Sequence, residues 1–269
     1  MSNIPNIGTL MREMGMVGQR MVEIDAAEGA AGNLSIYMRE LRSDKTEGFR
    51  EQAVIELPVA TPALADGWML ITGAGRRLRD IADSPETTLC LLHIDDRGKQ
   101  AVLLGGSSVR PTSELNSHLG IHNDQVGRRN LSYHGVVHAQ PPHLTYLSHI
   151  TPPGDTVGFN RRLLRWQPET IMQFPTGIAL LPFEVPGTLE QAEVTTTALR
   201  SYRAAVWQRH GMVARADKGV RAAGDLIDYA ETAARYVYMN LLTGEPGSGL
   251  SDEEMRLMCE RMGIEQRFF

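Results

Sequence analysis

The stretch Gly135-Val136-Val137-His138-Ala139-Gln140-Pro141-Pro142-His143 has the pattern of a buried strand that ends abruptly. Its apolar run leads to His138, and the two prolines stop the strand because proline cannot donate to a sheet ladder. A histidine at a strand end can project its imidazole into a cleft. Taken alone, His138 fits a packed or surface histidine better than a metal ligand.

A second stretch repeats this arrangement and changes the balance. The apolar run Ala205-Val206-Trp207 is followed by Gln208-Arg209-His210-Gly211, and glycine permits backbone angles that other residues rarely adopt. Two histidines that follow apolar strands point to a shared metal site more strongly than either one does.

A catalytic zinc ion usually takes three protein ligands and leaves a fourth position for water or substrate. With His138 and His210 as two ligands, the third remains open between two residues near His138. Gln140 lies on the same side of a strand and offers an amide oxygen. His143 can reach inward only if the prolines turn the chain back, and the sequence does not choose between them.

Glu114 follows Thr112 and Ser113 immediately before a helical pattern. Thr and Ser are common helix caps, and an acidic first turn is favoured by the helix dipole, so a capping segment explains these residues equally well. If the helix start faces a metal, its amides and hydroxyls can hold a phosphate while Glu114 acts as a base. Glu114, His118 and His122, four residues apart, form a rival metal stripe on one helical face.

The composition is that of a globular catalyst rather than a nucleic-acid or membrane binder. The 269 residues are 42% hydrophobic with a formal net charge of -5, and no Lys/Arg run stands out. Cys90 and Cys259 form no paired framework, which favours a reducing compartment, and we expect a cytoplasmic protein. The sequence indicates neither an export signal nor a membrane span.

Hydrophobic periodicity predicts one α/β domain over residues 1–269. Turns between several strands are too short for crossover helices, so we expect a mixed, largely antiparallel sheet with helices on both sides. The polar segment 41–52 is expected to be an exposed connection. The expected strands are 34–38, 54–57, 68–72, 88–94 and 101–104, and the expected helices are 9–27, 115–126, 143–150, 188–202, 220–242 and 251–262.

Two glycine-rich turns, 29–35 and 72–77, each join apolar segments and could expose backbone N–H groups to an anion. Neither matches a nucleotide-binding fingerprint. A phosphate site here requires both turns to lie beside Thr112 and Ser113.

The order of these motifs resembles the class II aldolase/adducin family over nearly the whole chain. The segments that carry the resemblance are Gly32-Asn33-Leu34-Ser35, Ile71-Thr72-Gly73-Ala74-Gly75, Pro111-Thr112-Ser113-Glu114-Leu115, Val137-His138, Val185-Pro186-Gly187-Thr188 and Arg209-His210-Gly211. Each is weak individually, whereas together, in this order and spacing, they are fairly specific.

The resemblance implies a three-layer α/β/α domain in a homotetramer with the active site at a subunit interface. Within the family it is closest to members that cleave L-rhamnulose 1-phosphate to dihydroxyacetone phosphate and L-lactaldehyde, as zinc-dependent aldehyde-lyases. It implies one Zn²⁺ per subunit on His138 and His210 and a proton shuttle at Glu114. The residues that it implies for phosphate binding are Gly32, Asn33, Gly73, Thr112 and Ser113.

The chain departs from the family pattern in several places. Gln140 stands where the family usually has a second histidine, so a weaker or different metal, or substitution by His143, is an alternative. Asparagine near Ala30 and a polar side chain near Ala74 are missing. No residue around Arg165 and Trp166 clearly corresponds to the general acid of the family, although Glu169 lies nearby in sequence. The alternatives are a non-catalytic, adducin-like binding or assembly protein, and an aldolase or epimerase acting on another sugar phosphate.

Overall fold

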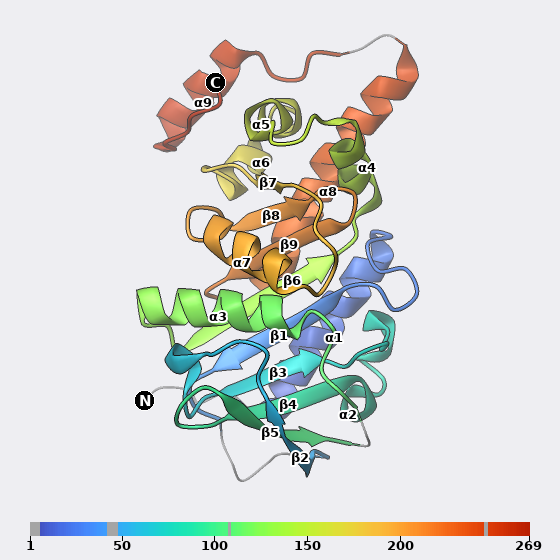
Figure 1. Ribbon diagram of the computed structural model, residues 1–269. Helices are drawn as coiled ribbons and strands as arrows, with labels where there is room; N and C mark the ends of the chain where they lie inside the picture. Colours follow the sequence, from blue (N-terminus) through green and yellow to red (C-terminus); the bar gives the residue numbers. More distant parts are fainter. Residues whose placement is uncertain (1–5, 42–47, 107–108, 245–246) are drawn as a thin grey trace.

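A nine-stranded sheet organises the computed structural model, which describes residues 6–41, 48–106, 109–244 and 247–269 (Figure 1). The strand order is β2-β5-β4-β3-β1-β6-β9-β8-β7. Neighbouring strands are antiparallel except for the parallel pair β7 and β8. The strands are β1 (Asn33–Met38), β2 (Arg50–Glu56), β3 (Trp68–Thr72), β4 (Leu89–Ile94), β5 (Gln100–Gly105), β6 (Tyr133–Ala139), β7 (Ala179–Leu181), β8 (Ala204–Trp207) and β9 (Gly211–Ala216).

The central strands are apolar on both faces because helices cover both sides of the sheet. On β1, Leu34 and Ile36 enter one buried cluster while Tyr37 enters another. On β6, the neighbours Val136 and Val137 likewise belong to different clusters. This alternation divides the core into two layers.

Helices α1 (Ile7–Glu23) and α8 (Val220–Thr243) pack together against one face, and α3 (Leu115–Arg129) and α7 (Leu189–Ala198) pack against the other (Figure 1). The expected α/β class, with a mixed and largely antiparallel sheet between helical layers, is confirmed. The remaining helical segments are η1 (Pro62–Leu64), η2 (Leu78–Asp80), α2 (Pro85–Thr88), α4 (Pro142–Ile150), α5 (Thr156–Leu164), α6 (Pro168–Gln173) and α9 (Asp252–Met262). Among the described residues, no helix combines the length and the apolar character needed to cross a membrane.

Some expected boundaries were wrong. Of the segment 41–52, expected to be an exposed connection, residues 42–47 lie outside the described residues, and Arg50 begins the edge strand β2. Its side chains are mostly exposed, so the strand lacks the apolar alternation by which strands are recognised. The short elements α5, α6 and β7 were not predicted, since each is too short for a clear period.

Antiparallel pairing brings several strand termini to the same end of the sheet. β1 begins at Asn33, next to the last residues of β3 and of β6. β9 begins at Gly211, beside the end of β6 and directly after the end of β8. Residues at the ends of these strands therefore meet although they are far apart in sequence.

Candidate active site at one end of the sheet

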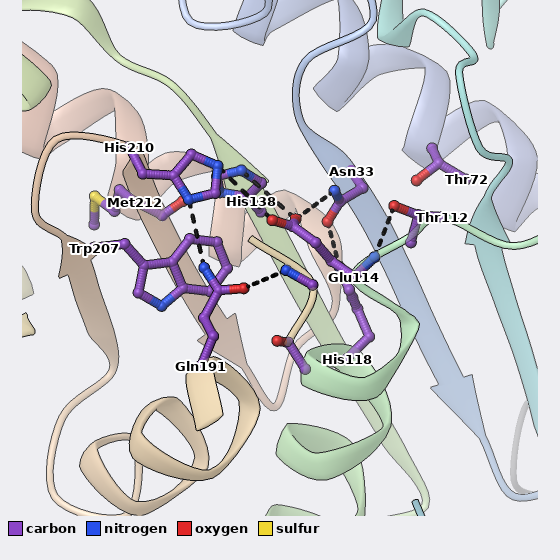
Figure 2. Close-up of polar contacts among 12 residues, drawn as sticks. Asn33, Thr72, Thr112, Glu114, His118, His138, Gln191, Trp207, His210 and Met212 are labelled. Carbon is purple, nitrogen blue, oxygen red and sulfur yellow. Dashed lines mark hydrogen bonds and ion pairs between the residues drawn. The ribbon is translucent and has the colours of Figure 1, made fainter. Parts of the chain in front are cut away.

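His138 projects from β6 with its ring orientation set by a backbone carbonyl. Its Nδ1 lies 3.0 Å from the carbonyl oxygen of Met212, which can only accept, so Nδ1 carries the proton. The other ring nitrogen, Nε2, faces Glu114 Oε2 at 3.7 Å (Figure 2). A backbone carbonyl on the second nitrogen is the usual way in which proteins orient a ligating histidine.

His210 is presented by the tight turn between β8 and β9. The turn is closed by a hydrogen bond from the His210 N–H to the carbonyl of Trp207, and the two rings stack with centroids 5.1 Å apart. Its Nε2 lies 3.8 Å from Glu114 Oε1. Burial, followed by the nearby His138, lowers the pKa of His210 to about 4, so the ring is neutral at neutral pH.

The glycine after His210 has a different role from the one expected. Arg209, not Gly211, adopts the positive φ in this turn, at 66°. A Cβ on Gly211 would lie 2.5 Å from the carbonyl oxygen of Ala139 and 3.0 Å from Cε1 of His138. Gly211 is therefore required because β6 and the His138 ring approach its backbone closely.

Glu114 immediately precedes α3, and its buried carboxylate lies between the two histidines. Asn33 Nδ2 donates a 2.7 Å hydrogen bond to Glu114 Oε2. Burial alone would raise the pKa of Glu114, but the nearby histidines, His138 first, and the Asn33 hydrogen bond outweigh it and lower this pKa below its ordinary value. The carboxylate is therefore ionised at neutral pH.

Glu114, His138 and His210 together form a group of possible metal donors, with one donor atom from each lying within 4.8 Å of the others. Two imidazoles and a carboxylate, mostly buried and with an open position left over, suit a catalytic zinc ion. The structure therefore brings together the two predicted histidine ligands. In this group Glu114, which was predicted as a base, supplies the third possible donor.

The candidates for a third ligand beside His138 have different surroundings. His143 lies at the start of α4, where its Nδ1 pairs with Glu231 of α8, so it is held away from the donor group. Gln140 follows β6 directly, and its Cγ would lie 3.2 Å from a Cβ on Gly211. Gln140 is thus close to the His210 turn, whereas His143 is a link between two helices.

The segments predicted to hold a phosphate converge on the same end of the sheet. Gly73 forms an isolated bridge with Pro111, and the N–H of Thr112 donates to the carbonyl of Thr72. Gly32, at φ 81°, precedes β1 and packs against the backbone of His138. Ser113 is exposed beside these segments. Both glycine-rich turns therefore lie near Thr112, as a shared anion site requires.

Two predicted features lie apart from the donor group. Glu169, the candidate general acid, is exposed on the first turn of α6. His118 and His122, the rival metal stripe with Glu114, instead share hydrogen bonds with the hydroxyl of Ser35. They point into the core beneath the site, so the stripe does not form a metal group with Glu114.

Sequence reasoning missed the residues that support the site. Gln191 accepts a hydrogen bond from the Gly187 N–H through its oxygen, and its amide nitrogen lies 3.4 Å from His210 Nδ1 (Figure 2). Asn116 donates to the carbonyls of Gly187 and Thr188, which ties α3 to the start of α7. These residues lie on helices that pack against segments distant in sequence, so no local sequence pattern predicts their role.

Comparison with known proteins decides the family. Residues 12–238 match the model of the class II aldolase and adducin N-terminal domain. The chain belongs to this family. The group of Glu114, His138 and His210 at the end of the sheet is thus the candidate active site of a class II aldolase-like domain.

Curated members of the class II aldolase and adducin family match most of this chain. The rhamnulose-1-phosphate aldolase of Bacteroides thetaiotaomicron is 28% identical over 260 residues, which are 96% of each chain. The enzyme of the same name from Pectobacterium carotovorum is 30% identical over 242 residues, 89% of this chain and 88% of the relative. The crystal structure of a sugar-phosphate aldolase from Thermotoga maritima has 27% identity and a TM-score of 0.76, covering 90% of this chain and 99% of its own.

Proposed function

We propose that this protein is a metal-dependent class II aldolase that reversibly cleaves a ketose 1-phosphate. L-rhamnulose 1-phosphate is the proposed substrate, with dihydroxyacetone phosphate and L-lactaldehyde as products, because relatives of that name match across most of the chain. The observation that carries the proposal is the buried group of Glu114, His138 and His210. A non-catalytic family member has no need to keep two imidazoles and a carboxylate together in this way.

In this proposal His138 and His210 hold a zinc ion, and Gln140 is the further candidate ligand that remains near them. When bound, zinc would supply positive charge beside the substrate oxygens on which negative charge develops. Glu114 carries a proton to or from the carbon at which the bond breaks. Its lowered pKa keeps it ready to accept a proton at neutral pH, and the Asn33 amide keeps it in place.

The phosphate of the substrate would be held at the convergence of the two glycine-rich turns with the segment before α3. The groups available there are the backbone around Gly32 and Gly73 and the hydroxyls of Thr112 and Ser113. Asn33 was also predicted for this role. Its amide oxygen and nitrogen are engaged by His118 and Glu114, so its contribution is the placement of Glu114 and at most one free N–H.

Assembly as a cytoplasmic homotetramer, with the site at a subunit interface, is part of the proposal. Glu169 is exposed and lies outside the donor group, so its role as general acid requires that a neighbouring subunit supply it. Sedimentation equilibrium tests the assembly. If the active protein is a monomer, Glu169 has no route to the site and the acid must be sought elsewhere.

The experiment that tests the function is release of dihydroxyacetone phosphate from L-rhamnulose 1-phosphate, followed with a coupling enzyme. The zinc-loaded protein is compared with the same protein after chelation. Release that chelator abolishes and zinc restores supports the aldolase. Metal uptake without release from this substrate shifts the proposal to another sugar phosphate, including an epimerase. A protein that takes up no metal supports the non-catalytic alternative.

A further inference from the structure

A continuous line of buried polar side chains runs from Glu114 into the core. It passes through Asn33 and His118 to Ser35, then to His122 and His134, and is here called the buried chain. The hydrogen bond from Asn33 to Glu114 is 2.7 Å long, and the one between His118 and Asn33 is 2.5 Å. The Ser35 hydroxyl lies 2.5 Å from His118 and 2.7 Å from His122. The last hydrogen bond, between His122 and His134, is 2.8 Å. Each member of the chain is at most 6% exposed.

The hydrogen bond from Asn33 Nδ2 to Glu114 Oε2 fixes the direction of the first two bonds. Because the NH₂ group of Asn33 faces Glu114, its carbonyl oxygen faces His118. That oxygen is an acceptor, and His118 must therefore carry its proton on Nε2. Figure 2 draws both bonds as dashed lines from Asn33, one to the Glu114 carboxylate and one toward His118.

The same reasoning carries the direction through the rest of the chain. All three histidines are neutral, since burial is the largest cause that lowers the pKa of each ring, to about 3 for His118 and His134. A neutral His118 with its proton on Nε2 must accept at Nδ1, so the Ser35 hydroxyl donates there. The hydroxyl oxygen then accepts from His122 Nε2.

His122, with its proton on Nε2, has only a lone pair at Nδ1. His134 must therefore donate to it from Nδ1, which leaves the Nε2 lone pair of His134 as the end of the line. That Nε2 atom is buried without a hydrogen-bond partner, as the end of a one-way chain of donors requires. Every hydrogen bond in the buried chain thus points toward Glu114.

We propose that the buried chain positions Glu114 by locking the orientation of the Asn33 amide. Without it, the two ends of the Asn33 side chain differ little in shape, and a flipped amide would present its oxygen to the Glu114 carboxylate. A flipped amide would force every later member of the chain to exchange its donor and acceptor roles, and the reversed chain would bury the Nε2–H of His134 without an acceptor. Ser35, His118, His122 and His134 are therefore positioning residues. Their catalytic consequence rests on the proposed aldolase function, whereas their hydrogen-bond direction does not.

The direct test is the tautomer of each buried histidine in the full-length protein labelled with ¹⁵N-histidine. Long-range ¹H–¹⁵N correlation spectra at neutral pH distinguish the two nitrogens, and single His→Gln variants assign the signals. We expect the proton on Nε2 in His118 and His122 and on Nδ1 in His134. A proton on Nδ1 of His118, or a doubly protonated ring at any of the three, overturns the chain.

A matched pair of serine variants tests the positioning role. Ser35→Ala removes the central hydroxyl, and Ser117→Ala removes an equally buried hydroxyl, next to His118, that has no hydrogen-bond partner. We expect Ser35→Ala to disturb the His118 and His122 signals and to lower kcat by about tenfold or more, with a smaller change in KM, because a small misplacement of a catalytic group is costly. Ser117→Ala should leave both unchanged.

Ser35→Thr retains a hydroxyl and should restore the histidine signals and most of the activity lost in Ser35→Ala. Unchanged kcat in Ser35→Ala, with disturbed signals, overturns the positioning role. If Ser35→Ala does not fold, the tautomers of the wild-type histidines and the signals and activity of Ser35→Thr still test the proposal. Expected tautomers in a protein that is inactive on every sugar phosphate tested would refute the proposed function and leave the direction of the chain established.

Discussion

Asn33 of β1 and His138 of β6 are directly opposite each other in the antiparallel pairing of the two strands. Directly paired residues project from the same face of a sheet. Both side chains consequently approach Glu114, which comes from the helix layer on that face, at 2.7 Å from Asn33 and 3.7 Å from His138. A register shift of one residue would send either side chain to the opposite face and dismantle the site.

Glu114→Gln is expected to lower kcat by about 100-fold or more, as loss of a general acid–base group commonly does. The amide cannot accept the proton that the proposed reaction moves, although its size preserves the packing between the two histidines. Dihydroxyacetone phosphate release from L-rhamnulose 1-phosphate measures the effect. The matched control is Glu190→Gln, on the exposed first turn of α7. Turnover in Glu114→Gln equal to that of Glu190→Gln would contradict the assignment.

His138→Ala and His210→Ala are each expected to weaken zinc binding by about tenfold or much more, since each removes one of the two imidazoles proposed to hold the ion. Competition with a chromogenic chelator measures the affinity. His149→Ala, an exposed histidine on α4, serves as the control. His143→Ala should bind zinc like the control because that ring pairs with Glu231. Loss of zinc binding in His143→Ala would show that His143 is a zinc ligand after all.

Gly211→Ala is expected to destabilise the protein by about 1–3 kcal/mol and to impair zinc binding, because the added methyl overpacks the space beside the His138 ring. Chemical denaturation and zinc titration report the two effects. In Gly247→Ala the added Cβ would meet its nearest atom at 3.7 Å, an ordinary contact. That variant should match the wild type. Equal behaviour of both variants would show that β6 yields more easily than the structure indicates.

The free energy of unfolding should fall as the pH decreases below about 6.5. His118, His122 and His134 have pKa values lowered in the folded state, chiefly by burial, from the ordinary 6.5, to about 3 for His118 and His134. Below pH 6.5 the unfolded chain therefore binds protons that the folded protein does not, until the pH approaches 3. At about pH 5.5, each of these three rings lowers the free energy of unfolding by about 1 kcal/mol.

Urea denaturation of the metal-free protein at about pH 7.5 and about pH 5.5 measures this slope. His134→Gln should reduce the pH dependence by the share of one group, because glutamine does not titrate. The exposed His149→Gln should leave the dependence as it is in the wild type. A stability that does not change over this range would mean that the buried rings become protonated without unfolding.

Local sequence patterns predicted the parts of the fold that bury a regular apolar face. The spacing along residues 220–242 predicted α8 to within one residue of its end, and the apolar run 68–72 predicted β3. The strand expected at 54–57 corresponds to the second half of β2, and the first half was missed because its exposed side chains have no apolar pattern. Within the site, the motif order placed His138, His210 and Glu114 as chemically important, and the structure gathers all three.

The failures within the site concern contacts between distant segments. His118 and His122 have the same four-residue spacing from Glu114 that a metal stripe would have, and spacing alone cannot tell whether such a face looks into a cleft or into the core. The positive φ expected at the glycine after His210 belongs instead to Arg209. The His143 ring pairs with the carboxylate of Glu231 on α8, 88 residues away, and no local sequence pattern predicts this contact.

Local sequence patterns account for the periodicities of the main helices and strands, for the strand-end positions of the two histidines, and for the motif order that marks the family. These features depend on neighbours along the chain, where 3.6- and 2-residue periods act directly. Three features follow from the packing of the folded chain instead: which donors meet, which way the Asn33 amide faces, and why Gly211 must be glycine. Those outcomes depend on strand register and on packing between layers, where contacts join residues that are far apart in the chain.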